Sequence, residues 1–199
     1  MYLLFFFSFT TDGMIETDVI FVMDSSSEVS QSDYRYEKEA VKSMARSLKV
    51  PSGQSRASVI TYGNFPSPVI KFDGYKSFPA FENFIDRAQR IGGRRRIDLA
   101  LEDAGKLLRE ARPSVRQNVI LLTSGRTHPL SRDLYVSAQR IFGNNADLLV
   151  IAVGKRPNFK ELTAIVQKPK HVYNVSSFSD LRRKSNEITK IVSQMPDSK

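Results

Sequence analysis

The stretch Asp18-Val19-Ile20-Phe21-Val22-Met23-Asp24 decides the fold of this 199-residue chain. Five consecutive apolar residues lie between its two aspartates, a pattern typical of a strand that is buried on both faces of a parallel sheet. Asp24 ends the run, and three serines follow it. We therefore expect a central strand that leads into a polar loop at one edge of a sheet.

Strand and helix patterns alternate along the rest of the chain. Further strands are expected at 57–62, 68–72, 118–123, 148–153 and 171–175. Helices are expected at 78–91, 99–108, 134–142 and 159–166, after a cap at Ser32-Asp33, and in the amphipathic pattern of Leu181, Ile188, Ile191 and Val192. Turn residues at 63–66 favour an antiparallel pairing of 57–62 with 68–72.

These patterns predict an α/β fold with a doubly wound, mostly parallel central sheet, one antiparallel edge strand and helices on both faces. In such sheets ligands bind at the carboxyl ends of the central strands. The loop that begins at Asp24 is therefore the first place to look for a site. The length fits one domain, which we place at 17–193, followed by a flexible tail at 194–199.

The amino terminus carries an apolar run at residues 2–8. This run resembles the apolar core of a secretory signal and is too short to span a bilayer. A basic segment before it and a clear cleavage site after it are missing. Residues 1–16 are thus predicted to be a signal peptide or an N-terminal extension, with a buried first strand or a truncated gene start as alternatives. We favour secretion and expect no membrane span.

The chain has a net charge of +9, a pI near 9.8 and no cysteine. This excess of positive charge favours an acidic partner, which for a secreted protein means an extracellular matrix protein or an acidic or sulfated glycan. Small basic clusters occur at 94–96, at 182–184 and at Lys168 with Lys170. None of the common nucleic-acid motifs is present, so no specific nucleic acid is expected. The oligomeric state is left open.

Several stretches in the same order resemble the von Willebrand factor A family across residues 17 to about 193. They are 18–26, 56–62, 92–93 with 97–101, 118–125, 149–154 and the closing segment 175–181. The resemblance implies the Rossmann-like fold expected above and an adhesion or matrix role. It also implies a metal-ion-dependent adhesion site, in which an Asp-x-Ser-x-Ser loop, a Thr and a second Asp hold Mg²⁺ through oxygen ligands.

This sequence departs from the family's metal-binding pattern. Asp24 and Ser26 match, but Glu28 stands where the second Ser belongs. The Thr position falls on Arg94 when counted from the glycine pair and on Arg95 when counted from the following helix. Ser124 replaces the second Asp, which removes a negative charge.

We hypothesise that the guanidinium of Arg94 or Arg95 takes the place of the metal and pairs with Asp24 and Glu28, because its donor fork suits carboxylates. The top face, including Ser26 and Ser124, would then bind its ligand without a cofactor. In one alternative the arginines point to solvent and Asp24 only caps its loop. In another, Asp24, Ser26 and Glu28 form a weak Mg²⁺ or Ca²⁺ site.

Catalytic residues are not expected. His128 and His171 lie far apart in sequence, and neither belongs to a nucleophile or metalloprotease motif. The chain is interpreted as a metal-independent extracellular protein-binding module of adhesion or matrix type, and not as an enzyme. Alternatives are a structural matrix spacer and metal-dependent adhesion through a weakened site. Asn174-Val175-Ser176 matches the N-glycosylation pattern, which fits secretion.

Overall fold

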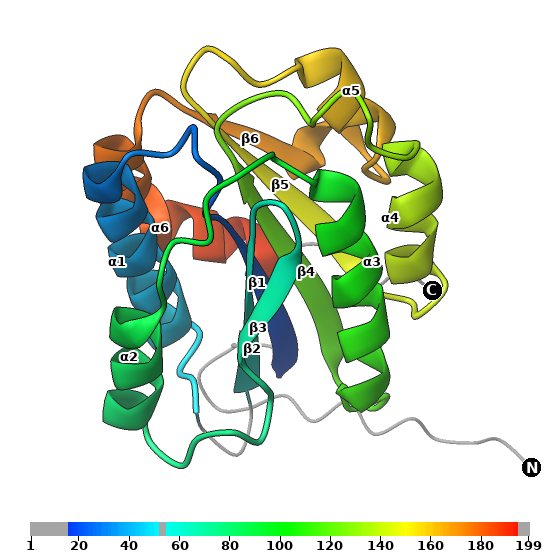
Figure 1. The fold of residues 1–199 in the computed structure, drawn as a ribbon. Helices are drawn as coiled ribbons and strands as arrows, with labels where there is room; N and C mark the ends of the chain where they lie inside the picture. Colours follow the sequence, from blue (N-terminus) through cyan, green and yellow to red (C-terminus); the bar gives the residue numbers. More distant parts are fainter. Residues whose placement is uncertain (1–15, 52–54, 195–199) are drawn as a thin grey trace, which may run out of the picture.

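Six strands form one sheet in the order β3-β2-β1-β4-β5-β6 in the computed structural model, which describes residues 16–51 and 55–194 (Figure 1). The strands are β1 (Thr17–Asp24), β2 (Ser55–Tyr62), β3 (Pro66–Ile70), β4 (Arg116–Thr123), β5 (Asp147–Val153) and β6 (Val172–Val175). All neighbouring strands are parallel except β2 and β3. The predicted mostly parallel sheet with one antiparallel edge strand is confirmed.

Helices cover both faces of the sheet (Figure 1). On one face lie α1 (Gln31–Ser47), α2 (Phe78–Arg87) and α6 (Phe178–Gln194), and on the other lie α3 (Ile97–Leu107), α4 (Leu134–Phe142) and α5 (Phe159–Ala164). Short 3-10 helices occur at Leu108–Glu110 and Pro169–His171. Strand β1 supplies both cores, because its side chains alternate between the two faces and every residue of the strand is buried.

Element boundaries differ from the predictions at several places. Ser30, not Ser32-Asp33, caps α1, with its hydroxyl accepting from the Asp33 N–H at 3.1 Å. Helix α2 ends at Arg87 rather than near residue 91, because the backbone leaves the helical conformation at Ala88, where ψ is 120°. Lys38 of α1 donates to the carbonyl oxygens of Asp86 and Ala88 at this end. Strand β3 starts two residues earlier than expected, and His171 lies in a 3-10 helix before β6.

A buried ion-pair cluster lies around Asp18, near the amino-terminal end of β1. We call this end of the sheet its lower end. The carboxylate is fully buried and accepts from the guanidinium groups of Arg56 on β2 and Arg112, and also from the Arg112 N–H at 2.7 Å. Burial alone would raise the pKa of Asp18, but the two arginines outweigh burial and lower it. Asp18 thereby ties β1 to β2 and to the segment that leads into β4.

The predictions for the chain ends fall mostly outside the described residues. Glu16 directly precedes β1, and Gln194 is the last residue of α6. Within the described part of the chain, none of the helices combines the length and apolar character needed to cross a bilayer.

Candidate functional site

Loops meet at the carboxyl ends of the central strands, where the chain direction switches between β1 and β4. From β1 the chain continues through α1 to β2 on one side, whereas from β4 it continues through α4 to β5 on the other. This arrangement opens a crevice at the strand ends in doubly wound sheets. The surrounding loops are residues 25–30, 88–96, 124–133 and 154–158, which together we name the upper edge (Figure 1).

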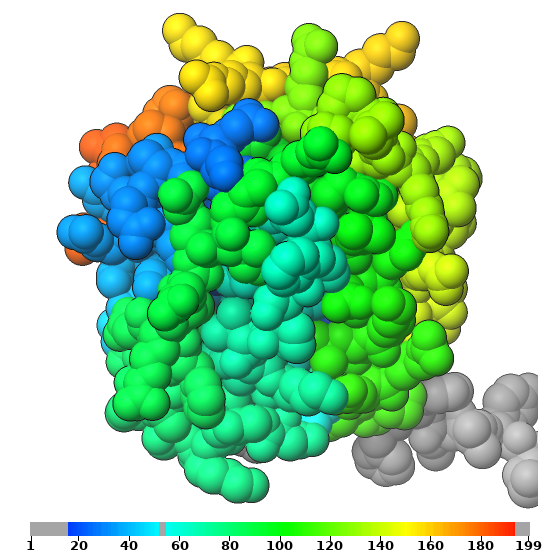
Figure 2. Space-filling view, viewed as in Figure 1, coloured from blue at the N-terminus to red at the C-terminus, as the bar shows by residue number. Residues whose placement is uncertain are grey.

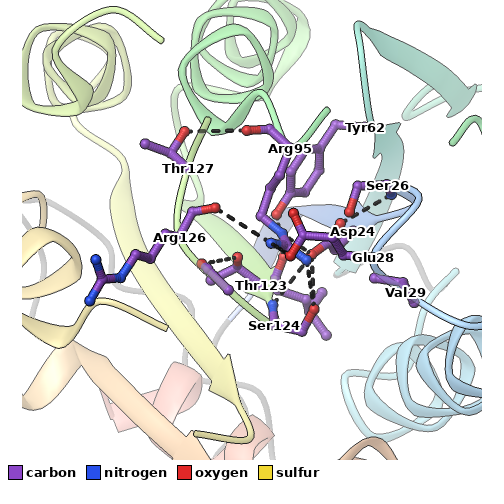
Figure 3. Close-up of polar contacts among 12 residues, drawn as sticks. Asp24, Ser26, Glu28, Val29, Tyr62, Arg95, Thr123, Ser124, Arg126 and Thr127 are labelled. Carbon is purple, nitrogen blue, oxygen red and sulfur yellow. Dashed lines mark hydrogen bonds and ion pairs between the residues drawn. The ribbon is translucent and has the colours of Figure 1, made fainter. Parts of the chain in front are cut away.

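Arg95 lies at the centre of the upper edge and binds side chains from two loops (Figure 3). Its Nε donates to Asp24 Oδ2 at 2.6 Å, its Nη1 to Glu28 Oε2 at 2.9 Å and its Nη2 to the Ser124 hydroxyl at 3.0 Å. Nη1 also approaches the carbonyl oxygen of Arg126 at 3.4 Å. One guanidinium therefore holds together the ends of β1 and β4.

The Arg95–Asp24 pair is buried, whereas Glu28 reaches solvent. The side chains of Arg95 and Asp24 are 1% and 0% exposed, and that of Glu28 is 54% exposed. Burial disfavours the charge on Arg95, but the nearby carboxylates of Asp24 and Glu28 outweigh it and raise the pKa of the guanidinium. Arg95 is therefore always protonated, and its positive charge neutralises Asp24 at the end of β1.

Of the two candidate arginines, only Arg95 points inward. Gly92 and Gly93 both have positive φ values, 75° and 74°, which turn the loop sharply. The Gly93 N–H donates to the Ser27 hydroxyl at 2.6 Å and the Ser27 N–H to the Gly93 carbonyl at 2.9 Å, so the register of the loop is set. Arg94 is exposed. The alternative with solvent-facing arginines is wrong for Arg95.

Ser26 joins the site mainly through its backbone. Its N–H donates to Asp24 Oδ1 at 3.1 Å, while its buried hydroxyl has no hydrogen-bond partner among the described residues. Ser124 donates to Asp24 Oδ2 at 3.3 Å through both its N–H and its hydroxyl. Both oxygens of the Asp24 carboxylate are therefore occupied by donors of this chain.

Glu37 is a member of the site that the sequence analysis missed. It is fully buried beneath Asp24, and its Oε1 accepts from the Asp24 N–H at 2.8 Å. Burial, together with the nearby charge of Asp24, raises the pKa of Glu37 well above its ordinary value. A signal was present in the sequence, because Glu37 falls on the apolar face of α1 between Tyr34 and Val41.

Gly125 is the second missed residue. A Cβ built at this position would lie 2.3 Å from Arg95 Nη1, so any larger residue here would displace the guanidinium. The sequence motif around residues 118–125 contains this glycine, but its role depends on a side chain 30 residues away.

The site offers little to a divalent cation as long as Arg95 is in place. Asp24, Ser26 and Glu28 are the oxygen ligands that the sequence proposed, and two of them already bind the guanidinium. Among residues 16–51 and 55–194, no group of three or more His, Cys, Asp or Glu side chains is arranged to hold a metal. The residues present fit an internal ion pair better than a metal centre.

Asp98 holds the loop that carries Arg95. It is buried and accepts from Arg96 Nε at 2.9 Å, from Arg96 Nη2 at 2.7 Å and from the Arg132 N–H at 3.0 Å. Burial opposes ionisation, but Arg96 and the N–H groups of Arg132 and Leu99 outweigh it, and the pKa of Asp98 falls to about 2. The Asp98 carboxylate thus connects the loop that ends at Arg96 to the loop that contains Arg132.

The stability contributed by Asp98 is expected to depend on pH. Because its folded-state pKa is about 2 against an ordinary 3.8, the ionised carboxylate stabilises the fold above about pH 4, and this stability is lost as the pH falls toward 2. The difference corresponds to about 2 kcal/mol. Urea unfolding should show that Asp98→Asn costs this amount near neutral pH and less near pH 2.5. An equal cost at both pH values would contradict the assignment.

The geometry and the sequence motifs agree with one known family. Residues 18–187 match the von Willebrand factor type A domain. The chain belongs to this family. The VWA domain thus covers the sheet, the Arg95 cluster and most of α6.

Relatives of this VWA domain include much longer proteins. The human von Willebrand factor A domain-containing protein 2 is 26% identical over 170 residues, which are 83% of this chain and 22% of that protein. The collagen alpha-1(VI) chain of Xenopus laevis is 27% identical over 154 residues, 75% of this chain and 15% of the collagen chain. The chain spans less than a quarter of the length of these two relatives, and its VWA domain is of a type that occurs in matrix proteins.

Solved structures confirm the fold. Proximal thread matrix protein 1 from the mussel byssus superposes with a TM-score of 0.85 at 19% identity, covering 90% of this chain and 49% of that one. A further structure of that protein, described as having a zinc-occupied MIDAS motif, gives a TM-score of 0.83 at 19% identity, covering 90% and 48%. At this identity the likeness concerns the VWA fold alone.

Proposed function

We propose that this VWA domain is a secreted adhesion module that binds a component of the extracellular matrix through its upper edge, without a metal ion. The observation that carries the proposal is the guanidinium of Arg95 between Asp24, Glu28 and Ser124. The occurrence of related VWA domains in a collagen VI chain and in a byssal matrix protein supports the extracellular setting.

The electrostatics of the site support metal independence. A divalent ion bound to Asp24 would lie next to Arg95, whose Nε is 2.6 Å from the carboxylate oxygen that the ion needs. Two cations that share one buried carboxylate repel each other strongly. Displacing Arg95 would also leave its guanidinium without the partners that offset its burial. A ligand must therefore be bound by side chains of the upper edge themselves.

A catalytic role is not part of the proposal. His171 is buried before β6, at the lower end of the sheet, and both of its ring nitrogens lack a partner among the described residues. His128 lies at the opposite end, in the loop after β4. Asn174 is exposed on β6 and remains the predicted glycosylation acceptor.

Metal independence is tested by calorimetric titration of chelator-treated protein with Mg²⁺, Ca²⁺ and Zn²⁺. We expect no saturable binding up to millimolar metal, because Arg95 holds the Asp24 carboxylate. Adhesion of the protein to a surface coated with basement-membrane extract should be equal in EDTA and in Mg²⁺.

Asp24→Ala serves as the control. Saturable metal binding in the wild type that disappears in Asp24→Ala would contradict the proposal and favour metal-dependent adhesion. Absence of adhesion under both conditions would instead favour a structural spacer.

A further inference from the structure

The basic clusters of the sequence are not equally available to a partner. In 94–96, Arg95 is buried and Arg96 pairs with Asp98, so only Arg94 is free to act outward. In 182–184, two of the three cations pair with Asp180. Runs of basic residues in the sequence therefore do not show which positive charges can bind a ligand. The exposed, unpaired cations have to be identified in the folded structure.

Five exposed cations lie on the upper edge and the adjoining first turn of α5. Within the described chain, their side chains have no hydrogen-bond or ion-pair partner. They are Arg94, Arg126, Lys155, Arg156 and Lys160. We name them the basic rim. Of the nearby carboxylates, Glu28 pairs with Arg95, and Glu161 of α5 interacts electrostatically with Arg126 without forming an ion pair with it.

Hydrogen bonds join the loops of the basic rim into one surface. Arg95 bonds to the carbonyl oxygen of Arg126, and the His128 N–H donates to the Arg95 carbonyl at 2.9 Å. The Thr127 N–H in turn donates to Glu161 of α5, where it opposes the rise that burial causes in the pKa of Glu161. Residues 155 and 156 lie just before this helix.

The views of the molecule agree with an outward-facing rim. In Figure 3 the Arg126 guanidinium points away from the Arg95 cluster. In Figure 2 long side chains of the segments after β4 and β5, coloured yellow-green to yellow, stand out from the upper surface. The cations thus project over a surface whose centre is closed by Arg95.

We propose that the basic rim binds a sulfated glycan chain. Sulfate groups are charged at every physiological pH and offer several acceptor oxygens, which suits arginine forks and lysine ammonium groups. The cations lie on three separate loops and on the first turn of α5, so an extended polyanion can contact several at once. Each contact adds a small, salt-sensitive contribution. The inference deepens the proposed function and rests on it, because it names the ligand of the same upper edge.

The test is titration of the whole chain with a heparin octasaccharide in EDTA. Saturable binding is expected, and it should weaken by roughly tenfold or more as salt rises from low to physiological concentration. The variant Arg126→Gln/Arg156→Gln should weaken it by roughly tenfold. The matched control Lys168→Gln/Lys170→Gln removes the same charge at the opposite end of the sheet, from exposed residues before β6, and should change affinity by less than about twofold. Thermal unfolding verifies that both variants fold.

The outcomes separate the inference from the proposed function. Equal weakening in both variants would mean that net charge alone attracts the glycan and would overturn the basic rim as a site. Absence of octasaccharide binding would overturn the inference, while metal independence would still be judged by the metal titration. Tighter binding of poly-L-glutamate than of the octasaccharide would overturn it in favour of an acidic protein segment.

Discussion

Replacing Arg95 with alanine is expected to lower the free energy of unfolding by about 3–5 kcal/mol. The substitution leaves the fully buried Asp24 carboxylate without its counter-ion and removes a donor from Glu28 and from Ser124. Breaking a buried pair on one side is costly because the remaining charge stays out of water. Urea unfolding near pH 7 measures the effect.

Arg94→Ala is the matched control, because Arg94 is the adjacent arginine and is exposed. Its expected change lies within about 0.5 kcal/mol. Combining Arg95→Ala with Asp24→Asn should recover part of the loss, since the unpaired charge is removed with its partner. Equal costs for Arg94→Ala and Arg95→Ala would show that the buried pair contributes no stability.

The variant Arg95→Ala also tests whether the guanidinium is what prevents metal binding. Arg95→Ala frees oxygens of Asp24 and Glu28 for a cation, and the buried Ser26 hydroxyl already has no partner among the described residues. Millimolar Mg²⁺ or Zn²⁺ should therefore raise the stability of Arg95→Ala but leave the wild type unchanged, because a ligand stabilises only the state that binds it. Equal responses of the two proteins would count against the guanidinium as the obstacle to metal.

Asp18→Ala is expected to cost about 3 kcal/mol at neutral pH. The carboxylate accepts from Arg56 and Arg112, including the Arg112 N–H, and all of these bonds are lost. The two arginines are partly exposed and can regain water, so the cost falls at the lower end of the range for buried pairs. Urea unfolding at neutral pH gives the value.

Two further measurements identify the cause of this loss. Asp73 also pairs with Arg56 but is largely exposed, so Asp73→Ala should cost less than about 1 kcal/mol. The pKa of Asp18 is lowered in the folded state, so its contribution is complete above the ordinary 3.8 and decreases as the pH falls below it. A cost of Asp18→Ala that stays constant in acid would point to lost packing and not to lost charge.

Much of the fold was predictable because its strongest signals are local. The run from Asp18 to Asp24 has the pattern of a strand covered on both faces, and the structure buries all of it. Element ends were less predictable where distant residues set them. Helix α2 stops at Arg87, and Lys38 of another helix binds the carbonyl oxygens of Asp86 and Ala88 at this end.

The candidate site shows the same division. Asp24, Glu28 and Ser124 were expected at the site because they fall at positions of the metal-binding pattern that the resemblance to the VWA family implies. Spacing left two arginines equivalent, because counting from either side differs by one residue. The positive φ values of Gly92 and Gly93 and the bonds to Ser27 turn Arg95 inward.

The sequence by itself determined the α/β class and the antiparallel edge, because hydrophobic periodicity and turn residues are local along the chain, and it predicted the end of the sheet where a site would lie. Only the tertiary structure decided which arginine is buried, that Glu37 lies beneath Asp24 and that Arg126 belongs to an outward basic rim. These features depend on which side chains share a small volume after folding, and a buried charge is tolerated only where the surrounding loops supply its partner.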